Sequence, residues 1–554
     1  MMMEVVGDVL LPYMLAKIIN QGIAERNVVY IIKIGAIMGL IAVIMAVGGV
    51  LGAWFASKAA MNFGADLRMD LFEKIQQFSF QNIDNFSTGS LITRLTNDIT
   101  QIQNMIMMTL RMCLRSPGIL IGAMVMAFVI SPKMAAIFII VLPVLAVLIV
   151  VIMRRAFPQF RTLQEKLDAL NSCIQEGLVG IRLIKSFVRG DYEEMRFEKR
   201  NQQLKEANLT AMKTMLLYTP LMTLALNITT VVVVWSGGNM IVAGNMQVGD
   251  LTAFTNYIVQ IMSSLTMLSI AFLNWARAIA SFRRVGEVLD EKIDLTDENA
   301  KHKDRAVCEG SVEFQNVSFR YYKNSPEWVI ENISFKLEAG KTLGIIGSTG
   351  SGKSTLVSMI PRLYDTDEGT VLVDGINVRD YGLKPLREGI GMVLQNNTLF
   401  SGSITENLKW GDEHADEKAV RKAAQNAQAA GFIDSFKDGY RTRLEQSGNN
   451  VSGGQKQRLC IARALLKCPK ILILDDSTSA VDTATERAIR EALHSEYKDM
   501  TKIIIAQRIR SVMDADEILV LDNGKTAGFG THEQLLADCP VYREIYDVQN
   551  GREE

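Results

Sequence analysis

The sequence predicts two domains of different class, an all-α domain of six transmembrane helices followed by a soluble α/β domain. Residues 1 to about 280 contain repeated apolar runs long enough to cross a bilayer, whereas residues 310–554 contain none. The second part instead alternates short β-type runs with helical patterns, which is typical of an α/β domain with a largely parallel sheet and an antiparallel N-terminal part. We therefore expect a transmembrane domain at 1–285, a polar linker at 286–310 and the soluble domain at 311–554.

The predicted spans are six apolar segments, which cover residues 1–19, 31–55, 106–130, 134–153, 214–242 and 251–276. The connections after the first, third and fifth spans are short. Those after the second and fourth spans run to about fifty residues or more and are rich in charged residues, with many Lys and Arg in the later one. Because positive charge marks the cytosolic side, the long connections are expected in the cytosol and the short loops outside.

The long connections themselves are predicted to be helices. Residues 28–77 contain no proline and consist mostly of good helix formers. Fifty helical residues extend about 75 Å, whereas the hydrocarbon core takes up only about 30 Å. We expect paired helices that project into the cytosol and reverse at residues 80–86 and near Gly190; a coiled surface domain is the alternative interpretation.

The first nineteen residues are apolar but contain Glu4, Asp8 and Pro12, and no basic residue precedes Lys17. A cleavable signal peptide would begin with basic residues and end at a site of small residues. We interpret this segment as the remainder of a first membrane helix whose cytosolic beginning is missing.

The overall composition argues against several classes of partner. The net charge is −1, so the chain has no basic footprint for nucleic acid. The six cysteines and four histidines are scattered without the spacing of a disulfide framework or a metal site. Free thiols in a reducing compartment are the expected state.

A phosphate-binding loop is predicted at residues 347–355. The apolar run at 343–346 precedes it and a helical pattern follows, which is the context that this motif requires. Glycines allow backbone N–H groups to surround phosphate oxygens, Lys353 adds a positive charge, and the Ser354 hydroxyl can bind Mg²⁺. The predicted phosphate-binding residues are Gly347, Ser348, Thr349, Gly350, Ser351, Gly352, Lys353, Ser354 and Thr355.

A metal-directed carboxylate is predicted at Asp475, which ends the apolar run at 471–474. A run of this kind is typical of a parallel strand buried on both faces, and ligands bind at the carboxyl ends of such strands. Asp475 and Ser354 are therefore the expected ligands of Mg²⁺. An N-cap aspartate is the weaker alternative beside the phosphate-binding loop.

A second anion-binding element is predicted where a serine and two glycines open an amphipathic helix. On its own this pattern indicates only the start of a helix. It lies about twenty residues before Asp475, and its residues are Ser452, Gly453, Gly454 and Gln455.

These motifs, taken in order, resemble the ATPase domain of ABC transporters. The order is Tyr321, the phosphate-binding loop, Gln395, NVSGGQ, ILILDD, the segment 479–482 and the segment 505–508. The preceding residues resemble the membrane half of type IV, or B-family, exporters, with GSLITRLTNDI at 89–99 as the matching helix start. The resemblance covers nearly the whole chain. It implies that two ATPase domains close head to tail, with each ATP between one phosphate-binding loop and the signature residues 452–455 of the other subunit.

The resemblance also implies roles for single residues. Tyr321 is expected to stack on adenine, with Tyr322 as the rival candidate. Gln395 is expected to contact Mg²⁺ or the attacking water. The turns at 80–86 and 190–197 match the coupling helices, which dock on the ATPase domains.

Two positions depart from the family pattern. Asp476 stands where the family has a glutamate that polarises the attacking water, and its side chain is shorter by one C–C bond, about 1.5 Å. A misplacement near 1 Å can cost on the order of 10²-fold in rate. Gln507 stands where the family has a histidine, so it can donate a hydrogen bond but cannot carry charge. Asp476, Gln507 and Gln395 are thus the expected catalytic residues of a site that binds ATP and turns it over slowly.

The expected function is ATP-driven export of amphipathic small molecules, drugs or lipids across the plasma membrane, with ATP and Mg²⁺ as cofactors and the ATPase domain in the cytosol. The partner is expected to be a second ABC half-transporter, with a heterodimer favoured because a partner would supply a competent site. A homodimeric exporter and an ATP-gated channel or regulatory membrane subunit remain alternatives. The membrane spans exclude a soluble ATPase that works on DNA.

Overall fold

The computed structural model describes residues 1–323 and 325–551, without the side chains of residues 269, 272–274, 276 and 277, and divides into two compact units. The first unit comprises Met1–Ile75 and Gly89–Asp290, and the second comprises Gln76–Thr88 and Glu291–Glu554. The short segment that interrupts the first unit therefore folds with the second.

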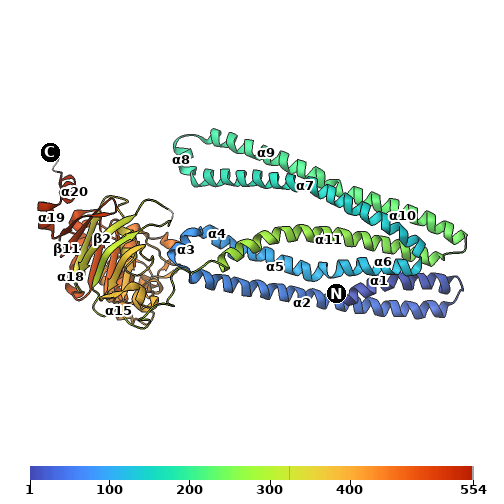
Figure 1. Cartoon of the computed structure of the whole chain (residues 1–554), viewed down its shortest axis with the longest axis horizontal. Helices are drawn as coiled ribbons and strands as arrows, with labels where there is room; N and C mark the ends of the chain where they lie inside the picture. Colours follow the sequence, from blue (N-terminus) through green and yellow to red (C-terminus); the bar gives the residue numbers. More distant parts are fainter. Residues whose placement is uncertain (324, 552–554) are drawn as a thin grey trace. The chain divides into compact units, whose positions relative to one another are not determined.

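The first unit is helical (Figure 1). Its elements are α1 (Met2–Lys17), η1 (Ile18–Ile23), α2 (Val28–Gln76), α4 (Thr88–Thr93), η2 (Arg94–Asp98), α5 (Ile99–Met108), η3 (Thr109–Cys113), α6 (Arg115–Ile130), α7 (Pro132–Val179), α8 (Ile181–Ser186), α9 (Gly190–Leu216), α10 (Tyr218–Val242) and α11 (Val248–Leu289).

The long helices confirm the expectation of continuous helical connections. α2 has 49 residues without a break, which corresponds to about 74 Å. α7 has 48 residues and begins where the Ser131 hydroxyl accepts a hydrogen bond from the Met134 N–H. Pro132 occupies its first turn, where the missing N–H costs nothing, and Gly180 follows its last residue.

The core of the first unit lies around α11, which packs against α1, α5, α6 and α10. Phe138 of α7 and Phe254 of α11 stack with ring centroids 5.3 Å apart. The buried Tyr257 hydroxyl donates to the Val9 carbonyl at 2.8 Å and thereby fixes α1 against α11. α7 and α9 run side by side as an antiparallel pair joined by α8 (Figure 1).

Four helical segments among the described residues are long and apolar enough to cross a membrane: Val28–Gln76, Thr88–Ile130, Pro132–Val179 and Gly190–Val242. The predicted spans at 31–55, 106–130, 134–153 and 214–242 lie within these segments. The predicted spans at 1–19 and 251–276 correspond to α1 and to part of α11, which do not belong to this set.

The chain reverses direction at two short helices, one of which was misplaced by the sequence analysis. α3 (Phe80–Asn85) lies at the expected turn and begins at a capping box in which Ser79 and Asn82 bond each other. The second turn was predicted at 190–197, but those residues form the first turns of α9 and the short helix is α8 (Ile181–Ser186). Asp191 and Glu193 stabilise the start of a helix at Gly190, so this glycine opens a helix instead of ending one.

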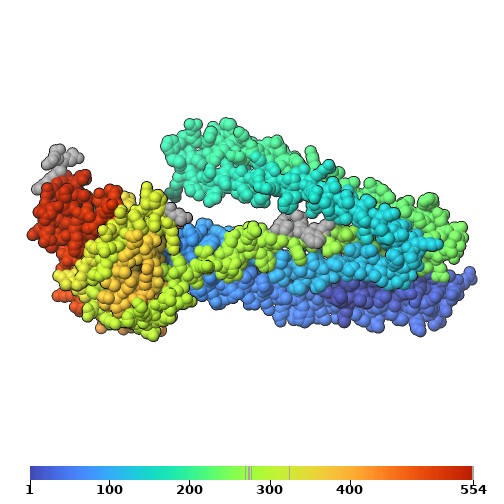
Figure 2. Space-filling model, in the orientation of Figure 1, coloured from blue at the N-terminus to red at the C-terminus, as the bar shows by residue number. Residues whose placement is uncertain are grey.

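α8 and the residues that follow it are exposed. Leu183, Phe187 and Val188 are among the exposed large apolar side chains, and α8 contains no buried residue. Val188 also has a positive φ of 54°, which is unusual for a β-branched residue. In the space-filling view this segment lies at the surface, at the end of the paired α7 and α9 (Figure 2).

The second unit is an α/β structure, as predicted. Its described residues form a six-stranded sheet in the order β12-β11-β3-β10-β9-β6 and a four-stranded antiparallel sheet in the order β2-β1-β4-β5, with β7 and β8 paired separately. In the larger sheet all neighbours pair in parallel except β11 and β12. The strands are β1 (Val312–Phe319), β2 (Ile330–Leu337), β3 (Thr342–Gly347), β4 (Glu368–Val373), β5 (Ile376–Asn377), β6 (Ile390–Val393), β7 (Gly402–Ser403), β8 (Arg443–Leu444), β9 (Ile471–Asp475), β10 (Thr501–Ile505), β11 (Glu517–Asp522) and β12 (Lys525–Gly530).

Besides α3, short helices flank these strands. They are α12 (Lys353–Ser358), η4 (Val378–Asp380), α13 (Leu383–Glu388), α14 (Ile404–Leu408), α15 (Glu417–Asn426), α16 (Ala430–Ser435), η5 (Gly439–Arg441), η6 (Gln446–Gly448), α17 (Gly453–Leu466), α18 (Thr483–Glu496), η7 (Ile509–Ser511), α19 (His532–Asp538) and α20 (Pro540–Asn550). Because β3, β9 and β10 are neighbouring parallel strands, the loops that follow them meet at one edge of the sheet.

Candidate active site

A cavity of about 320 Å³ lies where the loops after β3, β9 and β10 meet. Most residues predicted for nucleotide and metal binding line it. The lining residues are Tyr321, Val329, Thr349, Gly350, Gly352, Lys353, Ser354, Thr355, Gln395, Asp475, Asp476, Ile505 and Gln507.

The loop after β3 has the backbone that a phosphate-binding loop requires. Gly350 and Gly352 have φ angles of 85° and 87°, which only glycine adopts readily. A Cβ on Gly352 would also lie 2.6 Å from the Ile330 side chain. Both features explain why this position cannot carry a larger residue.

Lys353 lies against this loop. Its ammonium donates to the carbonyls of Gly347 at 2.9 Å and Ser348 at 2.7 Å. Burial lowers the pKa of Lys353, while the neighbouring Asp475 and Asp476 carboxylates raise it. A partly desolvated cation at this point strengthens the attraction for phosphate oxygens.

Ser354 and Asp475, two of the three predicted metal ligands, are in direct contact. The Ser354 hydroxyl donates to the Asp475 carboxylate at 2.9 Å. Asp475 is only 4% exposed, and burial raises the pKa of its carboxyl group, although the bond from Ser354 lowers it. Gln395 lines the same cavity.

This donor set fits Mg²⁺. Hydroxyl, carboxylate and amide oxygens are hard ligands, and Mg²⁺ is usually held by one or two carboxylates together with substrate phosphates. No group of three or more His, Cys, Asp or Glu side chains in the described part of the chain could hold a metal ion alone.

Tyr321, not Tyr322, lies at the cavity. The Tyr321 hydroxyl lies 2.8 Å from the Thr355 hydroxyl, and its ring makes edge contacts with Phe319 and Tyr364 at centroid distances of 5.1 and 5.4 Å. Tyr321 is 37% exposed and Tyr322 74%. A held ring with one exposed side can present a face to a flat base.

Asp476 and Gln507 bond each other across the cavity. The Gln507 amide donates to the Asp476 carboxylate at 2.9 Å. The Asp476 N–H donates to the Ile505 carbonyl at 3.1 Å, and the residue has a left-handed φ of 46°. Burial raises the pKa of the Asp476 carboxyl group, whereas the bond from Gln507 lowers it.

The signature residues 452–455 are not among those that line this cavity. Ser452 caps α17, and Ser452 and Gln455 form a reciprocal capping box with distances of 2.9 and 3.3 Å. A Cβ on Gly454 would lie 2.7 Å from the Ala480 carbonyl. The structure thus brings together the predicted loop, metal ligands, Tyr321 and Asp476, and leaves the signature elsewhere in the same unit.

Two residues that the sequence analysis missed connect these parts. Gln457, buried on α17, donates to the Ser479 hydroxyl at 3.3 Å and accepts from the Ala480 N–H at 3.0 Å, so it joins the signature helix to the segment after Asp476. A glutamine within an otherwise apolar helix face was the available sequence signal.

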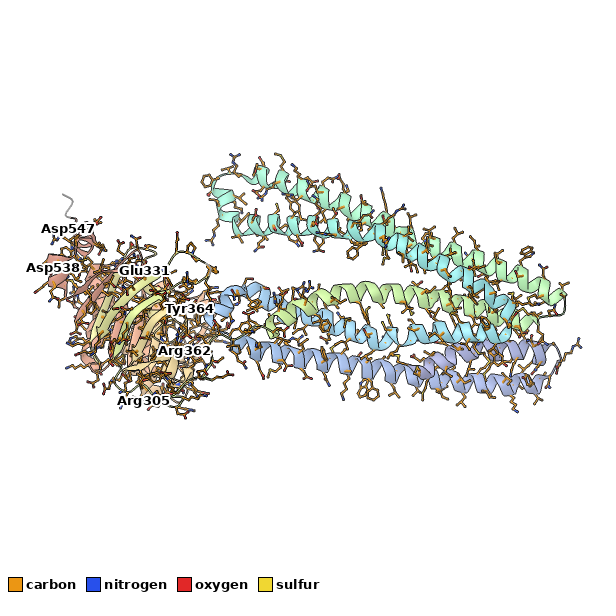
Figure 3. All side chains as sticks on the ribbon, in the orientation of Figure 1. Arg305, Glu331, Arg362, Tyr364, Asp538 and Asp547 are labelled. Atoms are coloured by element: carbon orange, nitrogen blue, oxygen red, sulfur yellow. The ribbon has the colours of Figure 1, made fainter. Side chains whose placement is uncertain are left out.

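Tyr364, labelled in Figure 3, connects α3 to the cavity. Its hydroxyl donates to the Asp84 carboxylate at 2.9 Å, and its ring contacts both Phe80 and Tyr321. Ser79 and Asn82 bond Asp294 and Glu291 at 2.7 and 3.1 Å. A single loop tyrosine carries no pattern from which this contact could be predicted.

A glycine-rich loop between a buried strand and a helix, its lysine, and a strand-end carboxylate bonded to the loop serine define a P-loop nucleotide-binding domain. The family model described as "ABC transporter" matches residues 330–479, and the one described as "ABC transporter transmembrane region" matches residues 2–265. The chain belongs to the ABC transporters.

Individual relatives agree with this assignment. The chain is 40% identical to "Uncharacterized ABC transporter ATP-binding protein YfiB" of Bacillus subtilis, over 100% of this chain and 96% of that protein. It is 35% identical to "Putative multidrug export ATP-binding/permease protein YgaD" of the same organism, over 90% and 85%. The structure of a bacterial Atm1-family ABC exporter with ATP bound matches with a TM-score of 0.83 at 25% identity, over 99% and 96% of the two chains. The chain is therefore a membrane-spanning ABC exporter with an ATP-binding domain.

Proposed function

We propose that this chain is one half of an exporter that moves amphipathic small molecules, drugs or lipids, and that its own nucleotide site binds ATP with Mg²⁺ but turns it over slowly. Six spans would cross the plasma membrane, with α1 and α11 added to the four strongly apolar segments. Two observations support their inclusion: the α1 and α11 contact through Tyr257, and the packing of α11 against α6.

The site residues support ATP binding by direct contacts. Lys353 and the N–H groups of the loop at 347–355 would hold the phosphates. Ser354, Asp475 and Gln395 would hold Mg²⁺, which neutralises phosphate charge when bound. Tyr321 would stack on the base, since its hydroxyl is fixed by Thr355.

The observation that carries the slow-turnover proposal is the hydrogen bond between Gln507 and Asp476. In-line attack by water requires a carboxylate that reaches the water. Here the shorter carboxylate accepts a bond from the neutral amide that stands in the family's histidine position. The group that would polarise water and the group that would contact the γ-phosphate are each other's partners.

A second half-transporter would complete the assembly, with a heterodimer favoured over a homodimer. Residues 452–455 do not line their own chain's cavity, which is consistent with the signature serving a nucleotide held by another subunit. In a heterodimer, this chain's Ser452 would close the fast site and the partner's signature would close the slow one.

The substrate class rests on the export relatives and on the family. YgaD is described as a putative multidrug export protein, and we propose a related function here. Reconstituted vesicles test transport directly, because a pump builds a gradient of an amphipathic dye on ATP addition. A channel would only dissipate a gradient that is already present, and that result would reject export.

The test of the slow site is ATP hydrolysis by the purified chain alone. We expect ATP to bind in the presence of Mg²⁺, measured by equilibrium binding, and steady-state hydrolysis to remain on the order of 10²-fold below that of the assembled pair. Rapid hydrolysis by a homodimer whose composition is verified by mass would reject the proposal.

A further inference from the structure

A second cavity, of about 590 Å³, lies in the second unit near the amino end of the same sheet. Its floor includes Lys502 and Ile504 of β10 and Thr342 of β3, and α18 and the segment around η7 form its walls. Lys502 and Ile504 share a strand face because side chains alternate along a strand. Ile505, which lines the nucleotide cavity, is on the other face, so the two cavities are separate.

Lys502 is a buried cation that faces this cavity. Its side chain is 5% exposed, and its ammonium has neither a hydrogen bond nor an ion pair with any described residue. Burial lowers the pKa of Lys502, although Asp516 and Asp499 raise it. Asp516 is itself bonded to Lys341 at 3.1 Å and to the Thr342 N–H at 2.8 Å. Because Lys502 opens onto the cavity, an anion that enters there can pair with its ammonium.

Further cations surround the same cavity. Arg487 and Arg490 lie three residues apart on α18, on one face of the helix, and Arg510 belongs to η7. Arg490 donates to the Arg510 carbonyl at 2.6 Å and lies 3.4 Å from Asp514, but its Nε is buried without a hydrogen-bond partner. Together with Lys502, these four cations outnumber the two carboxylates of the lining, Glu491 and Asp514.

The rest of the lining is mixed. Leu493, Ile504, Met513 and Ala515 are apolar, whereas Thr342, Thr483, His494 and Ser511 are polar. A ligand that fills the space therefore needs an anionic group and a body with an apolar or planar part. Phosphate suits converging lysine and arginine donors better than a single carboxylate does, because it offers three acceptor oxygens and up to two charges.

We propose that this cavity is a binding site for a small phosphorylated organic molecule, with its phosphate on Lys502 and Arg490 and its body against Ile504 and Leu493. The site is distinct from the nucleotide cavity. α18 begins directly after Asp482, and η7 begins two residues after Gln507. A ligand that bridges α18 and η7 therefore contacts the two segments that leave the nucleotide cavity, and its binding should change ATP turnover.

The test uses the full chain in lipid nanodiscs with saturating ATP and Mg²⁺, so that the nucleotide cavity is filled. Phenyl phosphate is the probe, inorganic phosphate tests the anion alone, and phenol tests the body alone. We expect calorimetry to detect phenyl phosphate binding, weaker binding of phosphate and none of phenol. Lys502→Met keeps an unbranched side chain but removes the ammonium group, so it should weaken phenyl phosphate binding at least tenfold.

Matched variants distinguish binding in this cavity from binding elsewhere on the chain. Lys498→Met removes an exposed lysine outside the cavity and should leave binding unchanged. Arg487→Gln changes an exposed residue, so the variant should fold normally. It should weaken phenyl phosphate binding about threefold. Absence of phenyl phosphate binding, or equal binding by Lys502→Met and the unaltered chain, would overturn the proposal.

Discussion

The nucleotide cavity has two regions that differ in what their side chains contact. In the region of the phosphate-binding loop, Lys353 lies on the loop and Ser354 bonds Asp475, so a cation, a hydroxyl and a carboxylate are arranged for phosphate and metal. In the region after β9 and β10, Asp476 and Gln507 bond each other. Under the proposed function, holding a nucleotide and hydrolysing it depend on different residues, so one can be kept while the other weakens.

The largest expected effect comes from Ser452→Arg, which tests whether this chain completes a site elsewhere. A bulky cation at the start of α17 blocks the contact of the signature with a nucleotide held by the partner. Steady-state ATP hydrolysis by the reconstituted pair should fall at least about 10²-fold, or roughly 2.7 kcal/mol in the barrier. Ser495→Arg, at an exposed position near the end of α18, is the control and should retain activity.

Lys353→Ala should weaken ATP retention in this chain's own cavity by about 30-fold, because a charged donor to phosphate contributes about 2 kcal/mol. The pair should nevertheless keep hydrolysing ATP, because under the proposed function its fast site uses the partner's phosphate-binding loop. Retained nucleotide and turnover are measured on the same preparation. Complete loss of hydrolysis would count against separate roles for the two sites.

Restoring the family residues with Asp476→Glu and Gln507→His should raise hydrolysis by the chain alone, by about tenfold. The longer carboxylate regains reach and the histidine can carry charge. The gain should fall short of 10²-fold because position 476 has a left-handed φ, which glutamate adopts less readily than aspartate. An unchanged rate would show that something other than these two residues limits turnover.

The smallest effect is expected for Asp476→Asn in the assembled pair. Under the proposed function this carboxylate belongs to the region that contributes little to turnover, so steady-state hydrolysis should change by less than about threefold. Should Asp476→Asn prove more damaging than Ser452→Arg, this chain's own site is the working one and the comparison between the two regions is wrong.

Much of the second unit could be predicted because its chemistry is local in sequence. β3 and β9 are buried parallel strands, which read as continuous apolar runs and place the loop and Asp475 at one edge. β2 and β12 carry no such signal. β2 alternates polar and apolar residues within a charged segment, and most of β12 is exposed and glycine-containing, so neither forms such a run.

The contacts that join the parts of the nucleotide site could not be predicted from apolar runs in the sequence. The bond between Asp476 and Gln507 joins residues 31 positions apart, and it depends on the parallel register that pairs Asp475 with Ile505. Tyr364 reaches Asp84 across 280 positions. The misplaced second turn has a simpler cause: Gly180 and Gly190 are both possible helix ends, and only the acidic residues after Gly190 distinguish a start from a stop.

The exposed apolar side chains around α8 affect how protein quality control in the cell recognises this chain. Leu183, Phe187 and Val188 expose 61%, 70% and 88% of their surface. The chain therefore presents a cluster of apolar side chains to water at α8 and the residues that follow it. Quality-control machinery recognises exposed apolar segments of this kind. Their exposure should therefore lower the steady-state abundance of the chain.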